Sequence, residues 1–360
     1  MITFIKKKII FFLNDNVLVP KNFFLKNKLN FADIGASSIT DNYKLLDYNF
    51  LELHLFEPDL RVLDSYYPIK KNINLYDIGL WSKKTNRNIF LLKNQAASSL
   101  FKPNLSILDK FEIGVLQYTT KKIQNVNLDT LDNLKKKNKI FDFIKIDAEG
   151  SDYEILLGGK KMLNSTLGVQ VEIQNIERYK DSALYYKVSE FLHKNGFEMF
   201  IYNKEFWTKN KNHNISTNFQ NVWSDVVFFK TDDFLVSLLK NKSKNYRLVQ
   251  VKKIIFLMIF YKLHDSAYNY LLTMKNKKII SSNDFLNLRK FILKNIKLNI
   301  IIIFKDLIRL LFILVLLPFS LFDLKRYFRL LFNLLGKNLN NLKRFFEIMI
   351  NKKVLRNKGI

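Results

Sequence analysis

The chain has 360 residues, of which 48% are hydrophobic, so it can bury a sizeable core. It contains no cysteine, which excludes disulfides and thiolate catalysis, and its four scattered histidines argue against a zinc site. The formal net charge is +27, but residues 231–360 carry 26 basic and 7 acidic side chains against 33 and 25 in residues 1–230. The basic character therefore belongs mainly to the C-terminal part, and charge alone argues only weakly for nucleic-acid binding.

The chain begins with "MITFIKKKIIFFLNDN", a basic cluster followed by about five apolar residues. A secretory signal needs an apolar run of roughly 7–15 residues and a small-residue cleavage site. This segment has neither feature, so we expect a cytoplasmic protein. We interpret residues 1–28 as a helical lead-in to the first domain.

Residues 29–230 alternate between strand-like and helix-like segments, which predicts a mostly parallel sheet covered by helices. A helix is expected over "SALYYKVSEFLHKNG", ending at Gly196, and an irregular stretch contains "QAASSLFKPN". The expected strands lie in "LNFADIGAS", "NFLELHLFEPD", "NINLYDIGLW", "KIQNVNLDTL", "FDFIKID", "LGVQVEIQ", "FEMFIYN" and "NVWSDVVFFK". Residues 231–360 lose this alternation and read as helices, so we expect a third, all-α region there.

The ends of the first two strands carry residues suited to a cofactor. Ligands of open α/β sheets bind beyond the carboxyl ends of the strands. Gly35 permits a tight turn, and Glu57 follows Asp33 by 24 positions. An acid about 20 positions after such a turn can accept hydrogen bonds from ribose hydroxyls, so the pattern favours a nucleoside-bearing cofactor over a purely structural turn.

The motifs "FADIGAS", "LFEPD", "SSL", "NLDTLDNL", "FDFIKIDAEGSDYEILLGGKKML" and "VQVEI" occur in an order and spacing that resemble FkbM-type S-adenosylmethionine-dependent methyltransferases. The resemblance covers about residues 29–230. It implies a Rossmann-like sheet of about seven strands, S-adenosylmethionine as cofactor, and O-methylation, commonly of sugars or polyketides.

The same resemblance assigns candidate cofactor residues. Its cofactor motif falls on Asp33, Gly35, Ala36 and Ser37, and its ribose-binding acid falls on Glu57. The family usually has further glycines after this motif, whereas this chain continues with "SSI". That departure keeps open a second interpretation, a catalytically inactive scaffold.

Two further residues are candidates for the adenine side of the cofactor. Asp77 ends the third expected strand, and Ile78 beside it can pack against the ring, as can Leu80. A simple turn aspartate explains Asp77 equally well.

Acidic residues cluster around the fourth expected strand, "FDFIKID". Asp147 and Glu149 would point from its end into the cleft, joined by Glu172 from the next strand. Asp152 and Glu154 have a sufficient explanation as acids at a helix start. Lys145 pairs with one of these acids or points to the other face of the sheet.

Converging carboxylates can act in more than one way. One could serve as a general base that deprotonates an acceptor hydroxyl, because burial and like charges raise a carboxyl pKa. They could also bind sugar hydroxyls, form structural ion pairs or hold a divalent cation. We favour the base and substrate-binding roles and assign no metal ligand. The loop with Ser98 and Ser99 is placed near the site by the resemblance.

The C-terminal region has two notable segments. Residues 298–322 are strongly apolar, but the cost of burying their charges is similar to the gain from their apolar side chains. The sequence therefore does not favour a membrane-spanning helix there over other placements. Residues 324–349 follow helical spacing with a basic opposite face, which suits an anionic membrane surface. We therefore expect residues 298–350 to dock the protein peripherally on the inner membrane face, where a glycan acceptor would be met. Packing on the chain's own domain or on a partner is the alternative.

Overall fold

The computed structural model describes residues 17–20, 23–24, 27–36, 48–59, 73–111, 114–209 and 220–296. Three of the sequence predictions fall wholly or mostly outside these residues: Ser37, the lead-in over 1–28, and the membrane-docking segment over 298–350. No helix among the described residues is both long enough and apolar enough to cross a membrane.

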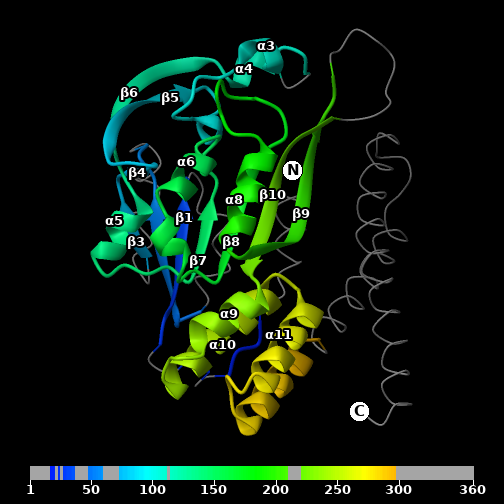
Figure 1. The fold of residues 1–360 in the computed structure, drawn as a ribbon. Helices are drawn as coiled ribbons and strands as arrows, with labels where there is room; N and C mark the ends of the chain where they lie inside the picture. Colours follow the sequence, from blue (N-terminus) through cyan, green and yellow to red (C-terminus); the bar gives the residue numbers. More distant parts are fainter. Residues whose placement is uncertain are drawn as a thin grey trace, which may run out of the picture. The chain divides into compact units, whose positions relative to one another are not determined.

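A seven-stranded sheet forms the centre of the fold, in the order β3-β2-β1-β7-β8-β10-β9 (Figure 1). The strands from β3 to β8 pair in parallel, whereas β10 runs antiparallel to both β8 and β9. This mostly parallel sheet confirms the predicted α/β class. Its strands are β1 (Leu29–Ile34), β2 (Leu51–Phe56), β3 (Ile73–Tyr76), β7 (Phe143–Ile146), β8 (Gly168–Gln174), β9 (Phe197–Trp207) and β10 (Gln220–Lys230).

The central strands are buried on both faces, as parallel strands usually are. All four residues of β7 are buried, and β8 is buried at six of its seven positions. One face forms a core with the helices that follow these strands, for example Ile146 and Val171 with Leu156. Those helices are α5 (Leu131–Lys136), α6 (Asp152–Leu157), α7 (Lys160–Leu163) and α8 (Tyr185–Lys194). As predicted, α8 ends just before Gly196, which has a φ of 77°.

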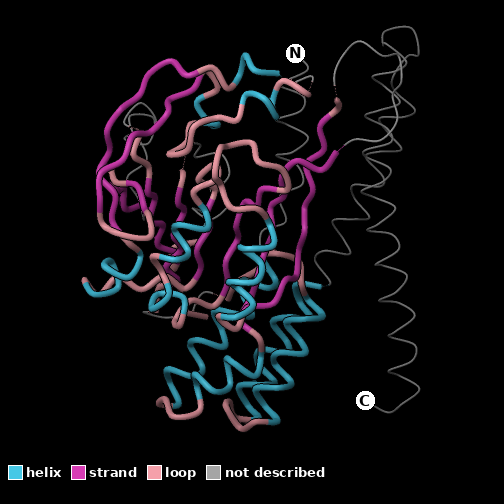
Figure 2. Tube along the Cα trace, turned by 45° about the horizontal axis from the view of Figure 1, so that its top comes forward, coloured by secondary structure: helices cyan, strands magenta, loops and turns pink. Residues whose placement is uncertain are grey.

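A second, three-stranded sheet was not expected from the sequence. It has the order β4-β6-β5, with β4 (Gly79–Leu80), β5 (Thr85–Leu92) and β6 (Thr120–Asp129). The segment "KIQNVNLDTL" is indeed a strand, but it pairs antiparallel with β5 and does not join the main sheet. The long pair β5–β6 curves away from the main sheet in both views (Figures 1 and 2). The connection between the two strands carries η3 (Gln95–Ala97), α3 (Leu105–Leu108) and α4 (Gly114–Gln117).

From residue 231 to 296 the described chain is helical, in agreement with the prediction. The helices are α9 (Asp232–Leu239), α10 (Lys244–Phe260) and α11 (His264–Asn276), and a further helical segment covers residues 282–296. Residues Pro20–Leu257 and Asn269–Ser282 form one compact unit. Within that unit, Lys253 of α10 forms a 2.7 Å ion pair with Asp142, just before β7. The proposed division into 1–28, 29–230 and 231–360 stays a prediction.

Candidate functional site

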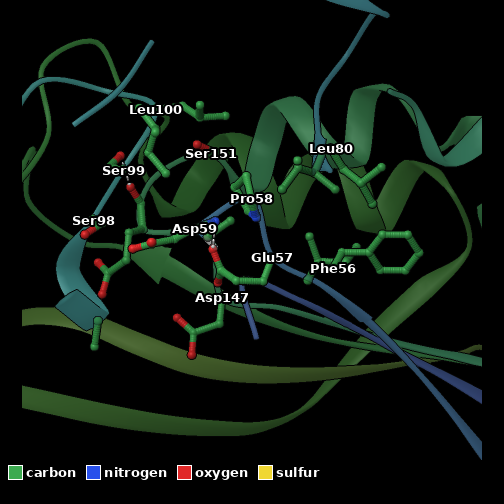
Figure 3. A pocket seen from close by; sticks show the side chains of 18 of the residues that line it. Phe56, Glu57, Pro58, Asp59, Leu80, Ser98, Ser99, Leu100, Asp147 and Ser151 are labelled. Atoms are coloured by element: carbon green, nitrogen blue, oxygen red, sulfur yellow. Dashed lines mark hydrogen bonds between the residues drawn. The ribbon is translucent and has the colours of Figure 1, made fainter. Parts of the chain in front are cut away.

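The strand order reverses between β1 and β7, and a cavity lies at the carboxyl ends of these strands. In open α/β sheets this switch point is where ligands bind. Its volume is ≈ 50 Å³, and it is partly open to solvent. The lining includes Gly35, Phe56, Glu57, Pro58, Asp59, Leu80, Ile89, Ser98, Ser99, Asp147, Glu149 and Ser151 (Figure 3).

Gly35 turns the chain at the end of β1 and brings it against the end of β7. Its φ is +81°, in the left-handed region that glycine adopts without strain. A Cβ at this position would lie 2.0 Å from the carbonyl oxygen of Asp147. The N–H of Gly35 donates to the carbonyl of Phe56 at 3.0 Å, and the buried Ala36 follows directly. The predicted turn therefore forms part of the cavity wall.

Glu57 leaves the end of β2 and lines the same cavity. It is only 6% exposed, and its Oε1 accepts a hydrogen bond of 2.8 Å from the N–H of Asp59. Phe56, Leu80 and Ile89 supply apolar walls nearby. A carboxylate beside apolar walls matches the two needs of a nucleoside, because ribose hydroxyls donate to the acid and an adenine ring packs on apolar surface.

Asp33 lies on β1 but not in the cavity lining, and it is fully buried. Lys145 is a residue of β7, and its Nζ lies 3.5 Å from Asp33 Oδ1 and 3.5 Å from Asp147 Oδ2. The orientation of this lysine, open from the sequence, is therefore toward the acids of the site.

Asp77 and Ile78 do not line the cavity in the described structure. Asp77 is exposed, and Ile78 packs beside the core cluster that includes Phe56. Leu80, two positions further along, does line the cavity. Of the two residues expected to pack against the ring, Leu80 is the one that lines the cavity.

The structure brings Asp147, Glu149 and Glu172 together. One carboxylate oxygen from each lies within 4.8 Å of the other two. Their exposures differ, since the side chains of Asp147, Glu149 and Glu172 are 32%, 14% and 4% exposed. Asp147 and Glu149 line the cavity, whereas Glu172 is not among the lining residues.

Arg178, which the sequence analysis did not single out, contacts two of these three acids. Its Nη2 contacts Glu172 Oε1 and lies 3.2 Å from Glu149 Oε2. Burial lowers the pKa of Arg178, but Glu172 and Glu149 raise it to a net value well above its usual range. The signal available in the sequence was a basic residue in "QNIERYK", shortly after the strand that carries Glu172.

Burial raises the pKa of both Glu149 and Glu172, while Arg178 opposes the rise. The two acids have different hydrogen-bond partners. Glu172 Oε1 also accepts from Gln174 at 2.6 Å, and two donors favour its ionised form. The Tyr179 hydroxyl lies 2.7 Å from Glu149 Oε2 and 2.9 Å from the carbonyl of Ala97. The Tyr179 hydroxyl is the donor to Glu149, so it helps to hold the carboxylate in place.

The turn after β7 is held by Asp152, whose two carboxylate oxygens accept the N–H groups of Ala148 at 3.2 Å and Gly150 at 3.0 Å. Glu149 and Gly150 both have left-handed φ values, of 48° and 94°. Such a backbone is costly for a glutamate and persists only where its surroundings enforce it. Burial raises the pKa of Asp152 to about 8. The helix-start acid therefore also fixes the turn that presents Glu149.

Two serines complete the cavity wall. Ser99 Oγ donates to the carbonyl of Glu149 at 2.6 Å, which ties the loop after β5 to the turn after β7. Ser151 is 1% exposed, and its hydroxyl has no hydrogen-bond partner among the described residues. Because Ser151 lines the cavity, this buried hydroxyl is a polar group that a bound ligand can satisfy.

These features define an α/β domain with a candidate ligand site at its switch point. Residues 33–199 match the family described as "Methyltransferase FkbM domain". This part of the chain is thus an FkbM domain, of a family of S-adenosylmethionine-dependent methyltransferases, and the resemblance drawn from the sequence is confirmed. A comparison with curated proteins gave no match.

Solved structures with a similar chain path include other methyltransferases. One is precorrin-6y C5,15-methyltransferase from Geobacter metallireducens GS-15, at 12% identity and a TM-score of 0.30, covering 58% of this chain and 84% of that one. Another is magnesium protoporphyrin IX methyltransferase from Synechocystis PCC 6803 with bound SAM, at 7% identity and a TM-score of 0.29, covering 64% and 79%. At these scores the likeness adds nothing to what the sheet order and the family match establish.

Proposed function

We propose that this protein is an S-adenosylmethionine-dependent O-methyltransferase that acts on a hydroxyl of a sugar or related acceptor. The observation that carries the proposal is the convergence of the Gly35 turn, Glu57 and Asp147 on one cavity at the switch point of a methyltransferase-family sheet. When bound, S-adenosylmethionine supplies an electrophilic methyl group on a sulfonium. The residues of the chain bind that cofactor and prepare the acceptor hydroxyl.

The cofactor residues fit this role by their chemistry. Glu57 offers carboxylate oxygens to a ribose, and Phe56, Leu80 and Ile89 offer apolar contact to an adenine. The hydroxyl of Ser151 gains a partner on binding. The loop that carries Ser98 and Ser99 also lines the cavity, so its displacement would widen the narrow space there.

Asp147 is the best placed of the three acids to act as general base. It is the most exposed of them and lines the cavity, whereas Glu172 is held by Arg178 and Gln174. Glu149 is engaged by Arg178 and Tyr179. A base must be within hydrogen-bond reach of the proton it removes, and it must have an oxygen free to accept it. In this proposal Asp147 takes the hydroxyl proton, while Glu149 shapes the acceptor side of the cavity.

Binding of the cofactor is the direct test. Isothermal titration with S-adenosylmethionine should show saturable binding by the wild type and a Kd raised about 10–100-fold in Glu57→Ala, because charge-assisted hydrogen bonds contribute roughly 1.5–3 kcal/mol. Glu52→Ala is the matched control, since Glu52 lies on β2, which Glu57 directly follows, but pairs with Lys28 and Asn74 outside the cavity. No binding by the wild type would remove the catalytic proposal.

That negative result would favour the second candidate, a methyltransferase-like scaffold without catalysis. The observation behind it is the small cavity, together with the "SSI" sequence where the family usually has glycines. This candidate predicts a folded protein that neither binds S-adenosylmethionine nor releases S-adenosylhomocysteine with any sugar acceptor.

For the cellular setting we propose a cytoplasmic protein held at an anionic membrane surface by residues 298–350. The support is the basic, helically spaced sequence over 324–349. Flotation with phosphatidylglycerol-containing liposomes compares the full chain with a form ending at residue 296. We expect only the full chain to float, and flotation that falls as salt rises. Equal flotation of both forms would contradict the proposal.

A further inference from the structure

We propose that Arg178 is the resident cation of the reaction centre: its guanidinium occupies the position at which a divalent metal ion would otherwise bridge Glu149 and Glu172. The role assigned to the centre rests on the proposed function. The claim about the cation rests only on the geometry of the described residues. Arg178 is thus a positioning residue, which acts through the carboxylates that it holds.

The spacing of the acids is suitable for a metal ion. Asp147, Glu149 and Glu172 each place a carboxylate oxygen within 4.8 Å of the other two. Oxygen ligands of this kind are what Mg²⁺ and Ca²⁺ prefer. Three such charges in a largely buried place require compensation, because like charges repel and lose their hydration there.

Arg178 supplies that compensation from within the chain. Its Nη2 contacts Glu172 and lies 3.2 Å from Glu149 Oε2, so one nitrogen serves both acids. Its Nε donates to Gln174 Oε1 at 2.7 Å, and its Nη1 donates to the Tyr118 hydroxyl at 3.3 Å. The planar fork of an arginine is therefore fixed at several points, which a lysine could not reproduce.

The surroundings of the guanidinium favour a permanent cation. Its central carbon lies 5.4 Å from the ring of Tyr179, 5.5 Å from that of Trp223 and 5.9 Å from that of Trp207. Aromatic faces attract cations, and these rings also exclude water from the contact. An arginine stays charged at all accessible pH values, so the compensation does not depend on metal supply or on pH.

The consequence is a division of labour among the three acids. Arg178 forms ion pairs with Glu149 and Glu172. Asp147 instead pairs with Lys145, whose Nζ lies 3.5 Å from Asp147 Oδ2. Asp147 therefore keeps an oxygen available at the cavity, and methyl transfer should proceed without a divalent cation.

Manganese binding tests the proposal directly, by electron paramagnetic resonance of free Mn²⁺ in titrations of the full chain. The variants are Arg178→Met, which removes the charge, and Arg178→Lys, which keeps it. Arg87→Met is the matched control, because Arg87 stacks on Trp81 at 4.4 Å in the second sheet. We expect Arg178→Met to bind Mn²⁺ at least about 10-fold more tightly than the wild type, since vacated carboxylates are good ligands. Arg178→Lys and Arg87→Met should resemble the wild type.

Adding Glu172→Gln to Arg178→Met should abolish the new Mn²⁺ site, which a merely structural role for Arg178 does not predict. A folded Arg178→Met that gains no Mn²⁺ affinity would overturn the proposal. A Mn²⁺ site in the wild type that Glu172→Gln removes would also overturn it. This second measurement does not require Arg178→Met to fold. Neither arm contains S-adenosylmethionine or an acceptor, so failure here is distinguishable from failure of the proposed function.

Discussion

Gly35 and Asp147 hold the two central strand ends together. The N–H of Asp147 donates to the carbonyl of Ile34 at 2.9 Å, and the Cα of Gly35 faces the Asp147 carbonyl so closely that a Cβ would lie 2.0 Å from its oxygen. The cofactor turn and the base proposed for the reaction thus share one contact. A substitution at either residue should therefore displace the backbone of the other.

Gly35→Ala is therefore expected to impair both stability and cofactor binding. The left-handed φ of +81° costs a non-glycine residue about 1–3 kcal/mol, and the backbone clash adds to this cost. Urea unfolding should show the loss, and the Kd for S-adenosylmethionine should rise at temperatures where the variant is folded. Gly79→Ala is the control, because a Cβ there meets the movable end of the Leu128 side chain. Equal stability of Gly35→Ala and wild type would contradict the contact.

Asp147→Asn is expected to lower kcat by about 10²–10⁴-fold with little change in the Kd for S-adenosylmethionine, because loss of a general base affects the chemical step. The measurement is release of S-adenosylhomocysteine with a panel of hexoses and deoxyhexoses. Glu154→Gln is the control, since Glu154 accepts a hydrogen bond from Ser82 at the start of α6. If Asp147→Asn retains full turnover while Glu149→Gln loses it, the base is Glu149.

Asp152 should make stability depend on pH. Its folded pKa of about 8 lies above the ordinary 3.8, so the folded state holds the proton more tightly than the unfolded state. The contribution is complete below pH 3.8 and is lost as pH rises toward 8, with a slope of at most about 1.4 kcal/mol per pH unit. Urea unfolding between pH 5 and about 8.5 should show this decline in the wild type and a flatter profile in Asp152→Asn. Parallel profiles would contradict the assignment.

The buried pair of Asp142 and Lys253 should join α10 to the sheet energetically. Asp142 Oδ2 accepts hydrogen bonds from Lys253 at 2.7 Å and from the N–H of Asn30 at 2.8 Å. Burial raises the pKa of Asp142 even though Lys253 opposes the rise. Lys253→Met leaves this carboxylate uncompensated and should cost about 3–5 kcal/mol.

The double variant Asp142→Asn with Lys253→Met should recover a large part of that loss, because both charges are then absent. Lys194→Met is the control, since its pair with Glu190 is exposed and should contribute less than about 1 kcal/mol. Additive losses in the double variant would show that the two side chains do not act as a pair.

The sequence by itself determined the strand ends and what they carry. Strand-like segments that alternate with helix-like ones predicted β1, β2, β7 and β8. The glycine and acids that follow them had to meet, because parallel strands place their carboxyl ends at one edge of the sheet. Gly35, Glu57, Asp147 and Glu149 were thus predicted to share a site, and all four line the cavity. Local order along the chain was sufficient for these residues.

Only the tertiary structure decided which side chains complete the site. Arg178 reaches Glu149 across 29 positions of sequence, and Tyr118 reaches Arg178 across 60. The sequence also predicted that β6 is a strand but not which strand it pairs with. It pairs with β5 and so lies outside the main sheet. Such pairings depend on where distant segments fold together, and no local spacing or periodicity encodes that. The physical reason is that charge compensation and strand pairing depend on residues far apart in the sequence, whereas turns and strand ends depend on residues that are neighbours in the sequence.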